Sequence, residues 1–203
     1  MATTVRPMTP DDLPAVVRIH QIAFKGFFLD RMGPSFLAAY YGSVLAYEKS
    51  IALVSESENG ALTGFVAGFI DPDAFYLHYR KGRIRLIPII VAALLKNPKL
   101  IAEIVRNSAR VQGHQGGKEQ TAELASIGAS EQGSGVGGEL TRGFCSQAFA
   151  QGALAVTLST DESGNESVRQ FYERRGFKAT HTEQRGNRVL CHYRLERPAA
   201  VSA

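Results

Sequence analysis

The spacing of hydrophobic residues changes several times along the chain, and each change predicts a boundary between elements. Apolar runs in the first part predict three strands, at residues 4–8, 51–55 and 61–70. Between the first two runs, apolar residues recur at helical spacing and predict two helices, one capped by Thr9 and one beginning at Pro34. Asn59 and Gly60 separate the second and third runs and predict a tight hairpin. The predicted order is therefore strand, helix, helix, strand, strand.

The second part of the chain continues the alternation of strands and helices. Apolar runs predict four more strands, at residues 121–130, 153–160, 177–184 and 188–196. A stripe that includes Leu140 and Phe144 predicts a helix over residues 138–151. A last helix is predicted after Asn165, and Gly176 ends it as the residue that follows the C-cap. About seven strands with interspersed helices predict one mixed α/β sheet.

Residues 71–120 interrupt this alternation and form an insertion between the third and fourth strands. Residues 80–118 contain nine Lys or Arg and one acid, a net charge of +8, so the rest of the chain sums to −4 against the total of +4. Two helices are predicted within the insertion, at residues 86–95 and 100–111. Either these cations form a solvated face, or they cover a binding site and attract an anionic substrate.

Composition narrows the class of protein. A chain of 203 residues with 44% hydrophobic residues fits one domain with its own core. Two cysteines, Cys145 and Cys191, give no reason to expect a disulfide, and the five histidines show no metal-ligand spacing. The longest apolar run is too short to span a bilayer, and the first residues lack the apolar core of a signal peptide. We expect a cytoplasmic protein with no metal, no nucleic-acid partner and no stable membrane insertion.

A glycine-rich stretch, residues 132–138, lies between a predicted strand and a predicted helix. Glycines allow close backbone approach, and the N–H groups at a helix N-terminus attract anions, so this position favours phosphate binding. Gly133, Gly135 and Gly138 match the dinucleotide pattern G-x-G-x-x-G, with Asp161 and Glu162 near the position of a ribose-binding acid. A dinucleotide domain would need further strand–helix units after Asp161, and only about forty residues remain.

The same stretch also matches a second pattern, Q-x-x-G-x-G, over residues 132–137. Downstream, residues 165–177 match N-x-x-x-x-x-F-Y-x-x-x-G-F. In this order and at this distance, the two motifs resemble those of the GNAT superfamily of N-acetyltransferases. The resemblance covers the chain from its first strand to its last, residues 3–197, and leaves residues 198–203 as a loose tail.

The resemblance implies the GNAT fold, a mixed sheet of about seven strands with helices on both faces and with its two central parallel strands splayed apart. It also implies that acetyl-CoA is the cosubstrate. The residues that would bind its pyrophosphate are Gln132, Gly133, Ser134, Gly135, Val136, Gly137 and Gly138. The residues that would contact the pantetheine arm are Ile127, Gly128 and Ala129, through their backbone, and Asn165. Asn165 is also suited to cap the helix that follows it.

The resemblance also suggests residues for the chemistry. Tyr172 matches the tyrosine that many GNAT enzymes place beside the CoA sulfur and would protonate the departing thiolate. Packing within the Phe171–Tyr172 pair is the alternative. Glu123, at the start of the central strand, is the candidate general base, acting through water; an exposed acid at a strand end is the alternative. The phenylalanines at positions 24, 27 and 28 would either line the acceptor pocket or fill the core.

The function implied is transfer of an acetyl group from acetyl-CoA to a primary amine of a small molecule or peptide. The charge of the insertion favours an anionic acceptor. The alternatives are a non-catalytic GNAT-fold module that binds acyl-CoA and, from the G-x-G-x-x-G overlap, a dinucleotide enzyme. The oligomeric state is left open, with a homodimer as one option.

Overall fold

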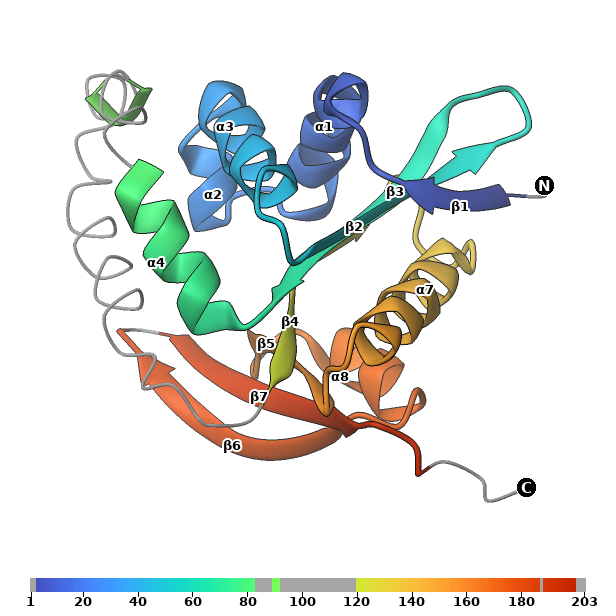
Figure 1. Ribbon diagram of the computed structural model, residues 1–203, viewed down its shortest axis with the longest axis vertical. Coiled ribbons are helices and arrows are strands. Elements are labelled where there is room, and N and C mark those ends of the chain that lie inside the picture. Colours follow the sequence, from blue (N-terminus) through green and yellow to red (C-terminus); the bar gives the residue numbers. More distant parts are fainter. Residues whose placement is uncertain (1–2, 83–88, 92–119, 187, 200–203) are drawn as a thin grey trace.

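The computed structural model describes residues 3–82, 89–91, 120–186 and 188–199 (Figure 1). Seven strands form one sheet in the order β1-β2-β3-β4-β5-β7-β6. The strands are β1 (Thr3–Pro7), β2 (Ser50–Ser57), β3 (Leu62–Ile70), β4 (Thr121–Ala129), β5 (Ala155–Asp161), β6 (Lys178–Arg185) and β7 (Arg188–Glu196). The helices are η1 (Pro10–Asp12), α1 (Leu13–Ala23), α2 (Phe28–Arg31), α3 (Pro34–Leu45), α4 (Pro72–Gly82), α7 (Val136–Ala150) and α8 (Glu166–Glu173).

The sheet consists of two antiparallel arms joined by one parallel contact. Strands β1 to β4 pair antiparallel in sequence order and form the N-terminal arm. Strands β5, β7 and β6 also pair antiparallel and form the C-terminal arm. The arms meet where β4 pairs parallel with β5. The predicted mixed sheet is confirmed.

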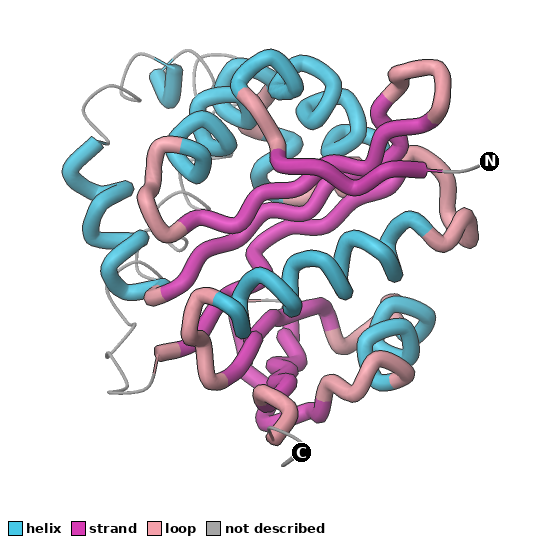
Figure 2. Tube along the Cα trace, turned by 45° about the vertical axis from the view of Figure 1, so that its right-hand side comes forward, coloured by secondary structure: helices cyan, strands magenta, loops and turns pink. Residues whose placement is uncertain are grey.

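Helices cover both faces of the N-terminal arm. Figure 1 shows α1 and α3 on one side of β2 and β3, with α7 on the other, and Figure 2 shows α7 running alongside the strands. One apolar cluster lies beneath α1 and α3, and a second lies between the sheet, α7 and α8. The predicted stripe on α7 is confirmed, because Leu140, Phe144 and Ala148 are buried in the second cluster. A Cβ atom at Gly68 of β3 would lie 2.8 Å from the Phe144 ring, so a glycine there lets α7 approach the sheet.

Helices α2 and α4 lie where the sequence analysis predicts no helix. Residue 71 carries the signal for α4: the Asp71 carboxylate accepts a 3.2 Å hydrogen bond from the Ala74 N–H, and Pro72 follows as the first helical residue. The predicted helices at residues 86–95 and 100–111 lie outside the described residues, except for 89–91. These three are helical, and Ile89 and Ile90 pack against Met32 and Phe36. Within the described ranges, no helix combines the length and apolarity needed to cross a membrane.

Candidate active site

A cleft of about 2290 Å³ runs between the two arms of the sheet. One wall comes from α1, α2 and α4, the floor from β4 and β5, and the other wall from α8, β6 and β7. Of the predicted site residues, twelve line this cleft: Glu123, Ile127, Gly128, Ala129, Gln132, Gly133, Ser134, Gly135, Gly137, Gly138, Asn165 and Tyr172. Val136 does not, because its side chain is buried in the cluster beneath α7.

The floor of the cleft opens because β4 and β5 pair over a short length. The parallel ladder joins Thr121, Ala122 and Glu123 of β4 to Ala155, Val156 and Thr157 of β5. Beyond Glu123, β4 continues to Ala129 and β5 continues to Asp161, but the ladder does not. The predicted splay of the central parallel strands is therefore present, and backbone groups of β4 face the opening.

A β-bulge at the start of the opening decides which groups of β4 face which side. Ser126 pairs with Ala67 of β3 and Leu124 pairs with Gly68, so Ala125 is the extra residue on β4. The bulge shifts the alternation of side chains. Leu124 lies in the cluster beneath α7, and so does Ile127, three residues later.

The same shift sets the direction of the backbone groups. Ser130 donates its N–H to the Thr63 carbonyl on the β3 side. Because backbone groups alternate along an antiparallel strand, Ile127 and Ala129 present theirs to the opening, whereas those of Gly128 face β3. A Cβ at Gly128 would lie 3.0 Å from the Phe65 ring, so this glycine also permits close packing on the α1 side.

The glycine-rich stretch forms a tight turn at the end of the opening. Gly133 and Gly135 have φ angles of +79° and +84°, and Gly135 is the N-cap of α7 in the left-handed conformation. A Cβ atom at either position would meet no atom within 4 Å. Gly138 donates its N–H to the Gly135 carbonyl, but the N–H groups of Val136 and Gly137 have no acceptor within the helix. Open space therefore lies beside backbone donors and the positive end of the helix dipole. This arrangement suits a phosphate group.

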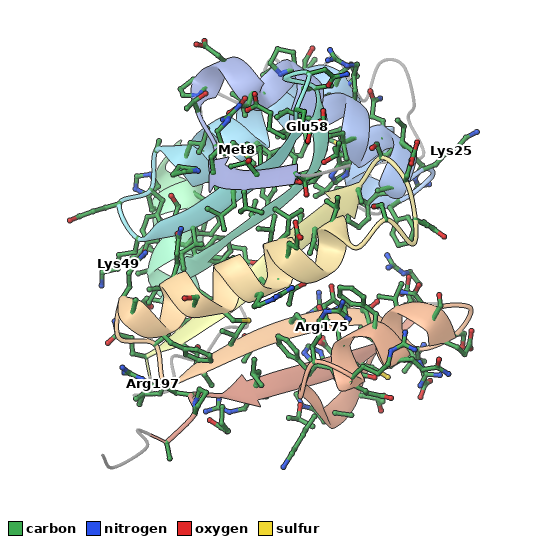
Figure 3. All side chains as sticks on the ribbon, turned by 90° about the vertical axis from the view of Figure 1, so that its right-hand side faces the viewer. Met8, Lys25, Lys49, Glu58, Arg175 and Arg197 are labelled. Atoms are coloured by element: carbon green, nitrogen blue, oxygen red, sulfur yellow. The ribbon has the colours of Figure 1, made fainter. Side chains whose placement is uncertain are left out.

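Arg175 lies between α7 and α8, beside this turn (Figure 3). Its guanidinium group stacks on the Phe171 ring at 3.6 Å and donates a 2.8 Å hydrogen bond to the Phe171 carbonyl. A Cβ at Gly138 would lie 2.5 Å from an Arg175 nitrogen, so the last glycine of the stretch makes room for this side chain.

Glu123 lies on the floor, where the parallel ladder ends. Its side chain is buried, with 7% of the residue exposed, and the Tyr76 hydroxyl of α4 donates a 3.0 Å hydrogen bond to Oε1. The alternative of an exposed acid at a strand end is wrong, because α4 covers this position. The carboxylate therefore belongs to the cleft.

Tyr172 lies on the α8 side of the cleft. Its ring packs against Phe171, Phe177 and Tyr193, and burial raises the pKa of its hydroxyl. The hydroxyl is therefore protonated at neutral pH. Tyr172 therefore both packs within the aromatic cluster and lines the cleft.

Asn165 is the N-cap residue of α8 by position, but its side chain does not cap the helix. Its Nδ2 donates a 2.6 Å hydrogen bond to Thr160 Oγ1 at the end of β5. This bond holds the amide at the edge of the cleft.

Phe24, Phe27 and Phe28 line the cleft on the N-terminal side. His20 lies beside them, buried, with a 2.7 Å hydrogen bond between Nδ1 and the Tyr41 hydroxyl. Burial lowers the pKa of His20 to about 4, so the ring is neutral. Sequence spacing places His20 beside the apolar stripe but does not reveal its buried partner.

A polar group on the opposite wall is not predicted from the sequence. Glu183 and Arg185 of β6 and His192 of β7 line the cleft. Their alternation along two neighbouring strands is the only sequence signal for a shared face. By contrast, Cys145 does not line the cleft, and burial raises the pKa of its thiol to about 12, which fits an inert packed thiol. Among the described residues, no group of three or more His, Cys, Asp or Glu could hold a metal ion.

Comparisons with known proteins agree with this geometry. The model of the acetyltransferase (GNAT) family matches residues 13–177. No match to a curated protein was found.

Solved structures share the fold at low sequence identity. A GNAT-family protein from Desulfovibrio desulfuricans is 18% identical, with a TM-score of 0.64, over 96% of this chain and 99% of that one. PaiA N-acetyltransferase from Thermoplasma acidophilum, solved in complex with coenzyme A, is 13% identical, with a TM-score of 0.59, over 95% and 98%. The ribosomal-protein-S18-alanine N-acetyltransferase from Escherichia coli is 15% identical, with a TM-score of 0.59, over 96% and 94%.

Proposed function

Because the chain belongs to the GNAT acetyltransferase family, we propose that it transfers an acetyl group from acetyl-CoA to a primary amine. One observation carries the proposal. The opening between β4 and β5 has a glycine turn with free helix N–H groups at one end and lies in the same cleft as Glu123 and Tyr172.

The residues around the opening fit acetyl-CoA. The turn from Gln132 to Gly138 would hold the pyrophosphate through backbone N–H groups, because the space beside Gly133 and Gly135 is open. The backbone groups of Ile127 and Ala129 would pair with the pantetheine arm, whereas Gly128 would serve the packing of α1. Asn165, held by Thr160, would contact the same arm.

Proton transfer follows from the charges of the reactants. An alkylammonium acceptor loses two protons on becoming an amide, and the departing thiolate gains one. Tyr172, protonated at neutral pH, would supply the proton to the thiolate sulfur. Glu123, held by Tyr76, would accept a proton through a water molecule as the carbon–nitrogen bond forms. A β4 backbone N–H would donate to the oxyanion of the tetrahedral intermediate.

The acceptor in this proposal is a small-molecule or peptide amine that carries an anionic group. This part rests on the net charge of +8 over residues 80–118, most of which lie outside the described residues. A nearby cluster of cations attracts anionic substrates and raises their association rate.

Release of free CoA thiol from acetyl-CoA tests the proposal. The acceptors are spermidine, phenethylamine, glucosamine 6-phosphate and an alanine-terminated peptide, with calorimetric titration of acetyl-CoA in parallel. Amine-dependent thiol release supports an enzyme, and preference for the phosphorylated amine supports an anionic acceptor. Binding without release from any amine would indicate a non-catalytic acyl-CoA module, and absence of binding would overturn the proposal.

A further inference from the structure

The C-terminal arm presents an imidazole and a carboxylate to the cleft. His192 pairs with Ser159 across the β5–β7 ladder, and both residues line the cleft. Tyr193, the next residue of β7, points to the α7 and α8 side. Because side chains alternate along a strand, His192 points to the opposite face, toward the acceptor side of the cleft.

Hydrogen bonds determine which nitrogen of His192 carries a proton. His192 Nε2 lies 3.0 Å from Glu183 Oε2, and the Arg185 guanidinium group donates two 2.8 Å hydrogen bonds to the same carboxylate. These bonds from Arg185 lower the pKa of Glu183, so the carboxylate is ionised and can only accept. Nε2 must therefore donate, which leaves the Nδ1 lone pair of neutral His192 available as a proton acceptor.

The surroundings of His192 keep the ring neutral near neutral pH. Burial lowers the pKa of His192, the hydrogen bond to Glu183 opposes that shift, and the neighbouring His181 and Arg185 add to it. The His181 ring stacks on the His192 ring at 4.3 Å between centroids. On β5, the nearest charged side chain in register is Asp161, which is paired with Arg188 of β7 through bonds of 2.8 and 2.7 Å. On β7 itself, Arg194 binds Glu196.

The two protons of an alkylammonium acceptor differ in acidity, and this difference separates two bases. The first proton comes from the alkylammonium cation, which is a weak acid. The group that accepts this proton works best when its pKa is close to neutral pH. An imidazole meets this condition better than a carboxylate does. The second proton comes from the strongly acidic nitrogen of the tetrahedral intermediate. A carboxylate acting through water is basic enough to accept it.

We propose that His192, oriented by Glu183, is a catalytic residue that takes the first proton from the bound ammonium group at Nδ1. The N–H bond of the ammonium group breaks, its electron pair stays on nitrogen, and imidazolium forms beside the Glu183 carboxylate. The imidazolium then releases its proton to solvent after the amide product leaves. This proposal rests on the proposed acetyltransferase function and adds a base on the C-terminal wall of the cleft, apart from Glu123 on the floor.

The test compares pH profiles of kcat and kcat/KM for the wild type and His192→Gln, with the panel amine that the wild type turns over fastest. The variant keeps an amide donor for Glu183 but has no titrating group. We expect kcat to fall about 10²- to 10⁴-fold. The acid limb of the pH profile, which in the wild type lies below the ordinary histidine pKa, should disappear. The matched control is His181→Gln, which alters the stacked partner outside the cleft and should retain the limb.

Glu183→Gln provides a second test, which does not depend on whether His192→Gln folds. Its amide oxygen still accepts from Nε2, but the loss of the negative charge removes the group that raises the His192 pKa. The acid limb should therefore move to lower pH, with normal acetyl-CoA affinity by calorimetry. An unchanged limb in His192→Gln, or in Glu183→Gln if the former does not fold, would overturn the proposal. Failure of the wild type to release CoA with any amine would instead count against the proposed function.

Discussion

Tyr76 donates a 3.0 Å hydrogen bond to Glu123 and so links the first helix of the insertion to the floor of the cleft. Tyr76 packs against Phe69 of β3 and Phe75 of its own helix, so its hydroxyl is held by a well-packed ring. The insertion therefore positions a carboxylate at the point where β4 leaves β5. This contact gives the insertion a structural role beyond its charge.

Substitution Glu123→Gln should lower kcat about 10²-fold with little change in KM, because the amide keeps the shape and accepts from Tyr76 but cannot take a proton. Steady-state thiol release measures this effect. Tyr76→Phe serves as the control, since it removes the hydrogen bond and keeps the carboxylate, and should reduce kcat less. An unchanged kcat in Glu123→Gln would remove Glu123 from the chemistry.

Gly135→Glu should abolish acetyl-CoA binding, because a carboxylate would occupy the open space beside the glycine turn and repel phosphate. Gly33 offers a matched control: it is the N-cap of α3, its φ is +88°, and no atom lies within 4 Å of its Cβ position. Both variants place a side chain at a positive φ, at a cost of about 1–3 kcal/mol each. Gly33 has a ψ of 169° and lies outside the left-handed region that Gly135 occupies, so urea unfolding must first show that Gly33→Glu folds. Calorimetry should show normal affinity in Gly33→Glu alone, and equal affinities in the two variants would contradict the phosphate site.

Tyr172→Phe should lower kcat more than it raises KM, since the hydroxyl is needed when the thiolate departs and the ring packing is retained. Tyr193→Phe serves as the control, because it removes a hydroxyl from the same aromatic cluster. That hydroxyl donates to Glu173, and Tyr193 does not line the cleft. Tyr193→Phe also removes the hydrogen bond to Glu173, so its stability measured by urea unfolding should fall at least as much as that of Tyr172→Phe. If kcat were the same in both variants, Tyr172 would have only a packing role.

His20 should make the fold sensitive to acid. Its folded-state pKa of about 4 lies below the unfolded value, so on acidification the unfolded chain takes up a proton that the folded chain does not. The stability supplied by neutral His20 is therefore complete above the unfolded pKa and declines as pH falls toward the folded pKa, by about 2 kcal/mol between pH 7 and pH 5.

Urea unfolding of the wild type and His20→Asn at these two pH values measures this difference. Asparagine keeps a polar group near the Tyr41 hydroxyl but does not titrate. The variant should lose less stability than the wild type between pH 7 and pH 5. The same loss in both proteins would show that His20 is not the source.

Local sequence was sufficient for most of the elements. The α7 stripe with Leu140 and Phe144 and the hairpin at Gly60 follow from periodicity or from the positive φ that glycine readily adopts. Gly176 also has a positive φ, but its predicted place directly after the C-cap is wrong, because α8 ends at Glu173 with Arg174 as its C-cap. The glycine stretch could also be placed, because its motif lies between two clear elements. Helix α4 was missed although Asp71 and Pro72 mark its start, because the charge of the insertion was the stronger pattern.

Contacts between residues distant in sequence were decided by the tertiary structure alone. Ala125 is a bulge only because of how β4 pairs with β3, and that pairing turns the backbone of Ile127, rather than that of Gly128, toward the opening. Glu123 is buried because Tyr76 covers it, and His192 meets Glu183 because β6 and β7 pair in one register. Periodicity reports which side of its own element a residue occupies. The register between elements depends on packing of the whole sheet, which no local stretch of sequence contains.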